Sequence, residues 1–258
     1  MLIKRVKNWM MDVCQYCIYN DRFKIDPPIV TPHEEILNEN DNVEKFIANN
    51  LDIFEIESKR QVEKFARELK DYNVNEKDEH GNTALHHAIY EEMDFLIEPL
   101  VKNGADPNIM NDEGITPLML AGSVNISRPI LTMYLDGNAN SNLQDKHGQT
   151  AIWKAAYECC IMSVMSLIMT EADVNIRDET GATPLIALCK NMKITARRDA
   201  LSTPKDVAEY LVKAGVDLFA MDKYGRTALD YAMKYGADDM IEYLQRVMCE
   251  YTPYAHKK

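Results

Sequence analysis

The sequence has no long apolar run, and nowhere does it approach the roughly 18 consecutive apolar residues of a membrane-spanning helix. Lys4, Arg5 and Lys7 lie near the N-terminus, but no apolar stretch and no small-residue cleavage site follow them. We therefore expect no secretory signal. Both absences favour a cytoplasmic protein.

The sequence also lacks the motifs by which many catalytic sites are recognised. None of its six His lies in an H-E-x-x-H pair, and it contains no G-x-S-x-G turn and no phosphate-binding G-x-x-x-x-G-K-[ST] loop. We therefore expect neither an enzyme nor a bound cofactor or metal ion.

The six cysteines do not suggest a disulfide framework; they are Cys14, Cys17, Cys159, Cys160, Cys189 and Cys249. The adjacent pair cannot easily bridge, and the others fall within helical patterns, which favours buried free thiols in a reducing compartment. Cys14 and Cys17 form a lone C-x-x-C. A zinc site would need two more ligands, and only His33 is near, so we interpret this pair as structural thiols.

Positive charge is scarce where negative charge is dense. The net charge is −12, and residues 26–100 alone carry −12 from seven Lys and Arg against nineteen Asp and Glu. Residues 1–25 carry +3 (five against two), and residues 101–258 carry −3 (seventeen against twenty). Because phosphate contacts need Lys and Arg, we do not expect nucleic acid as the main ligand. The acidic segment suits a basic protein partner, or serves solubility.

What the sequence does contain is a motif that returns. Residues 78–88 read D-x-x-G-x-T-A-L-H-x-A, and the pattern recurs at 111–118, 145–152, 178–185 and 222–229. Its glycines are 33, 34, 33 and 44 residues apart; they are Gly81, Gly114, Gly148, Gly181 and Gly225. A period of this length predicts a stack of small repeats that bury their apolar faces against one another.

With this motif and a period of 33, the chain resembles the ankyrin-repeat family over residues 57–249. The resemblance implies an all-α solenoid of helix-turn-helix repeats with hairpin loops, behind an N-terminal helical cap. It also implies protein binding, and we expect the chain to be monomeric on its own.

The motif divides the chain into segments. Residues 1–40 hold an amphipathic helix and a proline-rich loop, and residues 41–77 a degenerate capping repeat. Four repeats follow at 78–110, 111–144, 145–177 and 178–221, the last with an insert at 192–202 between its helices. Residues 222–249 form a C-terminal capping repeat with a polar outer face, and residues 250–258 a tail.

Motif residues of the first full repeat have expected structural roles. Asp78 and Gly81 build the hairpin turn, since glycine accepts a positive φ and aspartate bonds back to nearby amides. Thr83 caps the first helix through its hydroxyl. Phe95 is expected in the core with its apolar neighbours. At His86 the resemblance implies a side chain that ties loops together and is neither a base nor a ligand.

Later repeats depart from the motif. Gly104 ends the second helix of the first repeat in a left-handed turn, and Asn138 and Glu171 hold the equivalent positions. Asn tolerates that conformation, whereas Glu would cost about 1 kcal/mol, so we expect a differently shaped helix end at Glu171. Trp153 replaces the His and either fills a gap between repeats or reaches the groove as a binding anchor. The basic insert at 192–202 is a candidate for a function of its own.

Residues 1–20 have apolar residues at helical spacing, among them Leu2, Val6, Trp9 and Val13, next to three basic residues. Such a helix can dock on the first repeat and cover its open end, or it can lie on an anionic membrane. We favour docking and keep a peripheral membrane protein, anchored by residues 1–20, as the alternative function.

The resemblance implies that each repeat lines one concave groove with three hairpin-tip positions and two positions at the end of its first helix. The partner-binding residues expected there are Glu79, His80, Asn82, Tyr90, Glu91, Glu113, Ile115, His147, Gln149, Tyr157, Thr180, Tyr224, Arg226, Lys234 and Tyr235. The same positions also hold Lys190, Lys223, Ala182 and Asn191.

Two features of this groove suggest protein recognition. Four tyrosines supply rigid aromatic area of the kind enriched in binding hot spots. The charge also changes from acidic in the first repeats to basic in the fifth, which would orient a partner of opposite gradient. We therefore expect a non-enzymatic adaptor or inhibitor whose protein partner is basic where it meets the N-terminal repeats.

Overall fold

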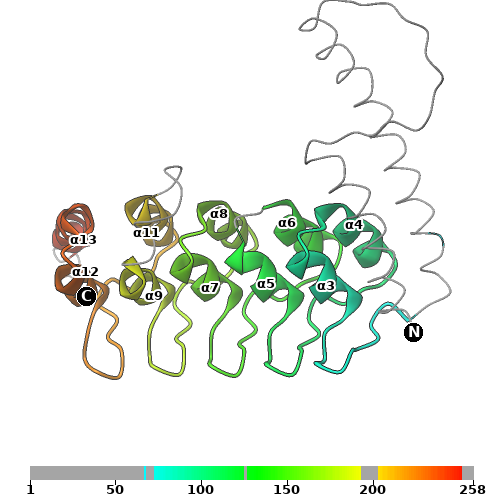
Figure 1. Cartoon of the computed structure of the whole chain (residues 1–258). Coiled ribbons are helices and arrows are strands. Elements are labelled where there is room, and N and C mark those ends of the chain that lie inside the picture. The colour runs from blue at the N-terminus through cyan, green and yellow to red at the C-terminus, as the bar shows by residue number, and fades with distance from the viewer. Residues whose placement is uncertain (1–66, 68–72, 125–126, 193–202, 252–258) are drawn as a thin grey trace, which may run out of the picture.

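The computed structural model describes residues 67, 73–124, 127–192 and 203–251, which form a row of helix pairs (Figure 1). Over these residues there is no β-strand. Beyond Arg67, which is helical, the helices in chain order are α3 (Ala84–Tyr90), α4 (Asp94–Lys102), α5 (Pro117–Ser123), α6 (Arg128–Leu135), α7 (Ala151–Tyr157), α8 (Ile161–Met169), α9 (Pro184–Lys190), α11 (Pro204–Lys213), α12 (Ala228–Tyr235) and α13 (Asp238–Tyr251). The all-α repeat fold expected from the sequence is confirmed.

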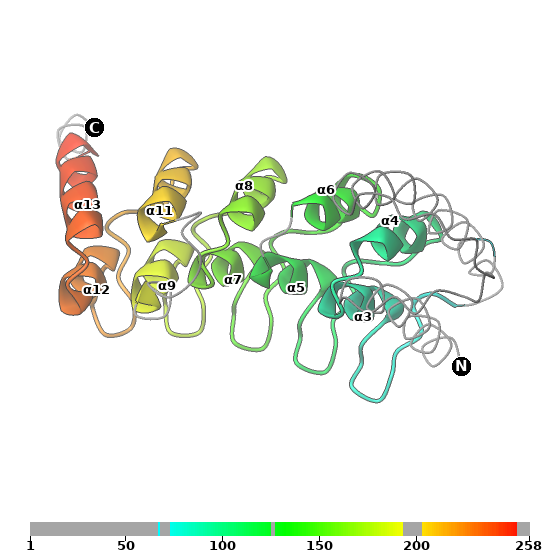
Figure 2. The same ribbon diagram turned by 45° about the horizontal axis from the view of Figure 1, so that its top comes forward.

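The helices form two layers. The first helices α3, α5, α7, α9 and α12 lie side by side, and the second helices α4, α6, α8, α11 and α13 form the other layer (Figures 1 and 2). Leu85, Leu118, Ile152 and Leu185 hold one motif position and are all buried between repeats. Burying each such side chain contributes about 1.5–3 kcal/mol, so the apolar motif positions are the main source of cohesion.

A threonine begins every first helix. The hydroxyls of Thr116, Thr150, Thr183 and Thr227 accept a hydrogen bond from the amide three residues later, at 3.2–3.4 Å. Thr83 is the N-cap of α3 and forms a capping box with His86: the Thr83 amide donates to His86 Nδ1, and the Thr83 hydroxyl lies 2.9 Å from that nitrogen. The ring of His86 thus takes part in the first helix terminus.

In the first four repeats the second helix is followed by a residue in the left-handed conformation. These residues are Gly104 (φ 88°), Asn138 (φ 55°), Glu171 (φ 57°) and Gly215 (φ 88°). After each, the next amide bonds back to the helix, as Ala105 does to Leu100 O at 3.0 Å and Ala172 to Leu167 O at 3.1 Å. The prediction of a differently shaped helix end at Glu171 is therefore wrong. The packing of the neighbouring repeats outweighs the local preference of glutamate.

An asparagine ladder joins the loops between repeats. The Nδ2 of Asn75 donates to Gly104 O (2.9 Å), and its Oδ1 accepts from the amide of Asp106 (2.8 Å). Asn108 makes the same pair of contacts one repeat later, to Asn138 O and the amide of Asn140. Residues 73–77 therefore occupy the same kind of loop as later repeats.

Three features differ from expectation. Phe95 is 41% exposed, because Leu96, Ile97 and Leu100 form the inward stripe of α4. Helix α13 continues through Glu250 and Tyr251, which were expected in the tail; Pro253 stands two residues beyond, and the residue before a proline avoids helix. Cys249 is exposed on this helix and is not one of the buried thiols.

The predictions for residues 1–40, for most of 41–77, for nearly all of the insert at 192–202 and for 252–258 lie outside the described residues. Helices α9 and α11 end and begin on either side of the insert where expected, with Thr203 as the N-cap of α11. Within the described part of the chain, no helix combines the length and apolar character needed to cross a membrane.

The left-handed Glu171 yields a stability prediction. Glu171→Gly should raise the free energy of unfolding by about 0.5–1 kcal/mol, since relief of left-handed strain exceeds the entropy that glycine adds to the unfolded chain. Asn138→Gly should gain less, because asparagine tolerates this conformation. Urea unfolding followed by circular dichroism measures both, and a loss of stability in Glu171→Gly would contradict the account.

Candidate functional site

Each hairpin turn is closed by one side chain that accepts two amides of its own loop. Asp78 Oδ1 accepts the amides of His80 (2.9 Å) and Asn82 (2.8 Å), while the amide of Gly81 donates to Asp78 O (3.0 Å). The same contacts recur at Asn111, Asp145, Asp178 and Asp222. The turn therefore uses backbone atoms of the tip residues, and their side chains are left to face outward.

Successive hairpins are also bonded to one another at their tips. The amides of Asp112, Lys146, Glu179 and Lys223 donate to the carbonyls of His80, Glu113, His147 and Thr180, at 3.0, 3.4, 2.9 and 2.8 Å. The approach is so close that a Cβ on Gly81 would lie 2.8 Å from the amide of Asp112. These bonds make the tips a continuous row, which Figure 1 shows below the first helices.

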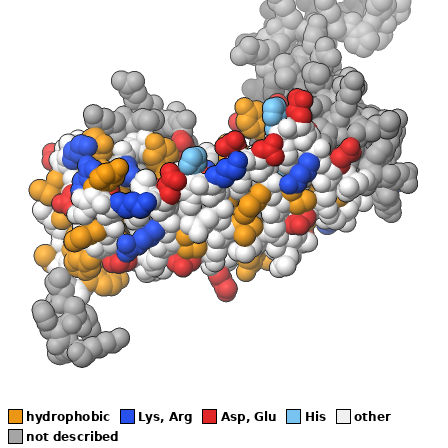
Figure 3. Space-filling view, turned by 90° about the horizontal axis from the view of Figure 1, so that it is seen from below, with side chains coloured by type: hydrophobic (Ala, Val, Ile, Leu, Met, Phe, Trp, Pro, Cys, Tyr) orange, Lys and Arg blue, Asp and Glu red, His pale blue; other side chains and the backbone are white. Residues whose placement is uncertain are grey.

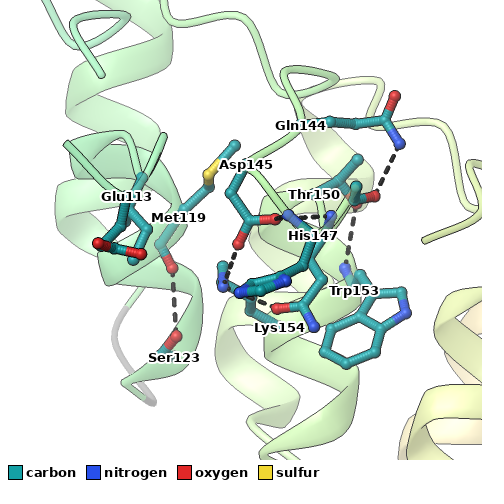
Figure 4. A network of polar contacts seen from close by, with 12 residues as sticks. Glu113, Met119, Ser123, Gln144, Asp145, His147, Thr150, Trp153 and Lys154 are labelled. Atoms are coloured by element: carbon teal, nitrogen blue, oxygen red, sulfur yellow. Dashed lines mark hydrogen bonds and ion pairs between the residues drawn. The ribbon is translucent and has the colours of Figure 1, made fainter. Parts of the chain in front are cut away.

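In three repeats the second carboxylate oxygen of the turn residue, Oδ2, contacts a side chain, and the type of that side chain differs from repeat to repeat. His87 Nε2 lies 2.8 Å from Asp78 Oδ2, and Lys154 Nζ lies 2.7 Å from Asp145 Oδ2 (Figure 4). Burial raises the pKa of Asp78, but hydrogen bonds from the amides of Asn82 and His80 and from His87 outweigh it. The pKa of Asp78 therefore lies below its usual value.

In the fifth repeat the partner is a phenol. Tyr231 donates its hydroxyl proton to Asp222 Oδ2 at 2.6 Å. Burial opposes ionisation of Asp222, but this bond and the two amide bonds, with the charge of Arg226, hold its pKa below the usual value. Burial and then the bond to Asp222 raise the pKa of Tyr231 to about 12, so it remains a neutral donor.

We call the tip positions and the ends of the first helices the hairpin face. None of the fifteen partner-binding residues expected from the sequence is buried. Glu79, His80, Tyr90, Glu91, Glu113, His147, Tyr224 and Lys234 are exposed, and Asn82, Ile115, Gln149, Tyr157, Thr180, Arg226 and Tyr235 are half-buried. Ala182 and Asn191 hold two positions of the face in the fourth repeat, but they are buried. Asn191 is drawn inward because its Nδ2 donates to Tyr157 O.

Trp153 fills space between repeats and is not an exposed anchor. It is 6% exposed and stacks on Tyr157, with ring centroids 5.2 Å apart and planes 11° from parallel. Figure 4 shows the indole beside Thr150, whose hydroxyl accepts from the amide of Trp153 at 3.3 Å. Among the described residues its buried Nε1 has no hydrogen-bond partner. The stack ties Tyr157 to the core, so this tyrosine contributes only part of its ring to the face.

His86, which holds the position of Trp153 two repeats earlier, has the structural role expected for it. Its Nε2 lies 3.0 Å from Ile115 O, a pure acceptor, and its Nδ1 accepts the amide of Thr83 at 3.1 Å. These two bonds require the neutral ring with its proton on Nε2. Burial lowers the pKa of His86 to about 4, so the ring remains neutral at physiological pH.

Charge changes sign along the hairpin face. Counting its five positions in each repeat, the first carries Glu79 and Glu91, the second Asp112 and Glu113, the third Lys146 and Glu158, the fourth Glu179 and Lys190, and the fifth Lys223, Arg226 and Lys234. The sums are −2, −2, 0, 0 and +3. Figure 3, which views the molecule from the hairpin side, shows Lys and Arg gathered at the end that carries the fifth repeat.

The described residues offer little material for chemistry. No group of three or more His, Cys, Asp and Glu suited to a metal ion occurs among residues 67, 73–124, 127–192 and 203–251. Burial raises the thiol pKa of Cys159 to about 11 and that of Cys189 to about 12. Both thiols are therefore protonated, and weakly nucleophilic, at neutral pH.

Comparisons with known proteins agree with this geometry. A family model described as ankyrin repeats (3 copies) matches residues 90–178 and again residues 162–253. The crystal structure of EF0377, an ankyrin repeat protein, superimposes with a TM-score of 0.63 at 26% identity, over 72% of this chain and 90% of that one.

Two curated relatives match similar shares of the chain. Palmitoyltransferase AKR1 of Lachancea kluyveri is 28% identical over 169 residues, which are 63% of this chain and 21% of that protein. Ankyrin repeat protein OPG189 of Variola virus is 27% identical over 199 residues, which are 67% of this chain and 36% of the viral protein. The chain thus spans between about a fifth and about a third of the length of these relatives.

The buried His86 predicts a pH dependence of stability. The unfolded ring protonates near pH 6.5 and the folded ring near 4, so stability present above pH 6.5 is lost as the pH falls towards 4. Between pH 7.5 and 5 this loss amounts to about 2 kcal/mol. His86→Gln can keep one donor and one acceptor without titrating, and should flatten that part of the curve. Parallel curves for the two proteins in urea unfolding would show that His86 is not responsible.

Proposed function

The chain belongs to the ankyrin-repeat family, whose model spans well over half of it, and we propose that it is a non-enzymatic protein-binding module. It acts as an adaptor or inhibitor in the cytoplasm by covering part of a partner's surface with its hairpin face. The partner is a protein rather than a nucleic acid, and it is basic where it meets the acidic first two repeats. The module itself is monomeric.

The observation that carries this proposal is the separation of scaffold and surface. Turn side chains and tip-to-tip bonds fix the backbone of the tips. The fifteen side chains expected to bind all remain at least partly accessible. A surface fixed before binding loses little conformational entropy when a partner docks, so more of the contact energy appears as affinity.

Tyrosines supply the main candidates for anchors. Tyr90 is 76% exposed and Tyr224 is 69% exposed, at opposite ends of the hairpin face. Exposed tyrosines on a rigid frame combine apolar area with a hydroxyl, and tyrosine is enriched among hot spots. Tyr157 lies between them, but part of its ring packs on Trp153.

The enzymatic name of one relative does not transfer to this chain. The match to the palmitoyltransferase covers 21% of its length, and the aligned part of this chain overlaps the repeats. The described residues of this chain supply a scaffold and an outward-facing surface, which is sufficient for binding and requires no chemistry.

A double variant tests this function. Tyr90→Ala with Tyr224→Ala should reduce capture of the chain's protein partners from cell extract at least about tenfold, because hot-spot tyrosines contribute about 2 kcal/mol each. Quantitative mass spectrometry of the captured proteins, compared with the unchanged full chain, provides the measurement. Circular dichroism should show the same helical signal for both.

The matched control replaces two half-buried tyrosines of the second helices, Tyr134→Ala with Tyr210→Ala. It removes the same side chains from outside the hairpin face and should leave the captured set unchanged. If the control lost the partners while Tyr90→Ala with Tyr224→Ala retained them, the binding surface would lie on the other layer of helices.

A further inference from the structure

Four cations gather at the C-terminal end of the hairpin face: Lys190, Lys223, Arg226 and Lys234, here called the C-terminal basic cluster. Lys223 and Lys234 are exposed, and Lys190 and Arg226 are half-buried. The ion pairs formed by lysine and arginine within the described part of the chain involve Lys102, Arg128, Lys154, Arg177 and Lys213, and none involves a member of the cluster. Among the described residues, the four positive charges of the cluster therefore have no directly paired carboxylate.

Aromatic rings hold three of these cations in place. The guanidinium carbon of Arg226 lies 4.8 Å from the ring centroid of Tyr224 and 5.1 Å from that of Tyr231. Lys190 Nζ, from the fourth repeat, lies 5.7 Å from the centroid of Tyr231. Lys234 Nζ lies 5.3 Å from that of Tyr235. Rings orient a cation without neutralising it, so the charge remains available to an anion.

Three carboxylates of the fourth and fifth repeats make other contacts. Asp222 accepts two amides and the Tyr231 hydroxyl. Asp230 Oδ2 accepts the amide and hydroxyl of Thr227 at the start of α12. Glu179 leans towards the third repeat, where its Oε1 lies 3.5 Å from His147 Nδ1. None of the three forms an ion pair with a member of the cluster within the described part of the chain, although the charge of Arg226 helps to lower the pKa of Asp222.

The third repeat shows the opposite arrangement. There the lysine at the position of Tyr231, Lys154, pairs directly with the turn carboxylate of Asp145 at 2.7 Å and donates to Gln149 at 2.9 Å. The charge of Lys154 is therefore used within the fold. In the fifth repeat the neutral phenol of Tyr231 bonds to the turn carboxylate instead, and the half-buried Arg226 lies against the rings of Tyr224 and Tyr231.

We propose that the C-terminal basic cluster is a carboxylate-binding subsite, which takes a short acidic segment of the protein partner with at least two Asp or Glu side chains. The inference rests on the proposed function and specifies the partner at one end of the face. Arg226, in contact with the rings of Tyr224 and Tyr231, offers a planar fork that matches a carboxylate, and the three lysines add point charges to the cluster.

The charge of the remaining face favours a protein segment over a nucleic acid. A polyanion running along the face would meet the four carboxylates of the first two repeats, Glu79, Glu91, Asp112 and Glu113. A polypeptide can change sign along its length and meet both ends favourably. An acidic stretch next to a basic stretch is therefore the partner chemistry that the whole face fits.

The test uses the full chain and three fluorescent probes of similar length. One is a peptide with four Glu spaced by Gly and Ser, the second has Gln in place of Glu, and the third is a single-stranded oligonucleotide. By fluorescence anisotropy the Glu peptide should bind at least about tenfold more tightly than the Gln peptide, and raising the salt concentration should weaken it.

Arg226→Glu should weaken binding of the Glu peptide about tenfold, and Lys190→Glu should weaken it in the same direction. Lys213→Glu makes the same charge change on α11 outside the hairpin face, and should leave the affinity within about twofold, because it lies outside the cluster. Arg226→Lys, which keeps the charge and loses the planar fork, should lie between wild type and Arg226→Glu.

Three results would overturn the subsite: equal binding of the Glu and Gln peptides, equal losses in Arg226→Glu and Lys213→Glu, or tighter binding of the oligonucleotide than of the Glu peptide. Each can occur while the tyrosine double variant still loses its captured proteins, in which case protein binding holds and only the acidic specificity fails. If the tyrosine double variant captures the same proteins as the unchanged chain, the proposed function fails, whatever the peptides show.

Discussion

One contact is repeated at every hairpin: the turn side chain that accepts two amides of its own loop. Asp78, Asn111, Asp145, Asp178 and Asp222 make it in the five repeats. The contact gives a hydrogen-bond acceptor to loop amides that lie outside any helix. It also sets the spacing at which the tip amides bond to the next hairpin. Because these bonds use backbone atoms, the outward side chains can vary without cost to the fold.

The same carboxylates link the scaffold to the electrostatics of the surface. Where His87 or Lys154 pairs with the turn, a basic group is used for structure. Where Tyr231 pairs with Asp222, the cations around it stay available. The charge that a partner meets therefore depends on which residue stands nine positions after the turn carboxylate, as well as on the count of basic residues.

The sequence predicts the repeats and their local chemistry well, because the turn at Asp78 and the caps at Thr116 or Thr203 are short-range patterns. Prediction from the sequence fails where contacts between repeats determine the conformation or burial of a residue. Glu171 follows the turn of its neighbours because packing overrides its preference, and Phe95 turns outward because its neighbours fill the stripe. Ala182 and Asn191 occupy face positions yet are buried. The motif does not predict the contact between Lys190 and Tyr231, because the two residues belong to different repeats. Tyr231 does hold the same motif position as His87 and Lys154.

Partners are proposed to bind the hairpin face, and a structure of the full chain bound to a protein that it captures would show whether they do. We predict contacts at the hairpin tips and first-helix ends of at least three repeats, with partner carboxylates near Arg226 and partner Lys or Arg near Glu79 and Glu113. A partner seated on the outer surface of the second helices, with the tips left in solvent, would contradict it.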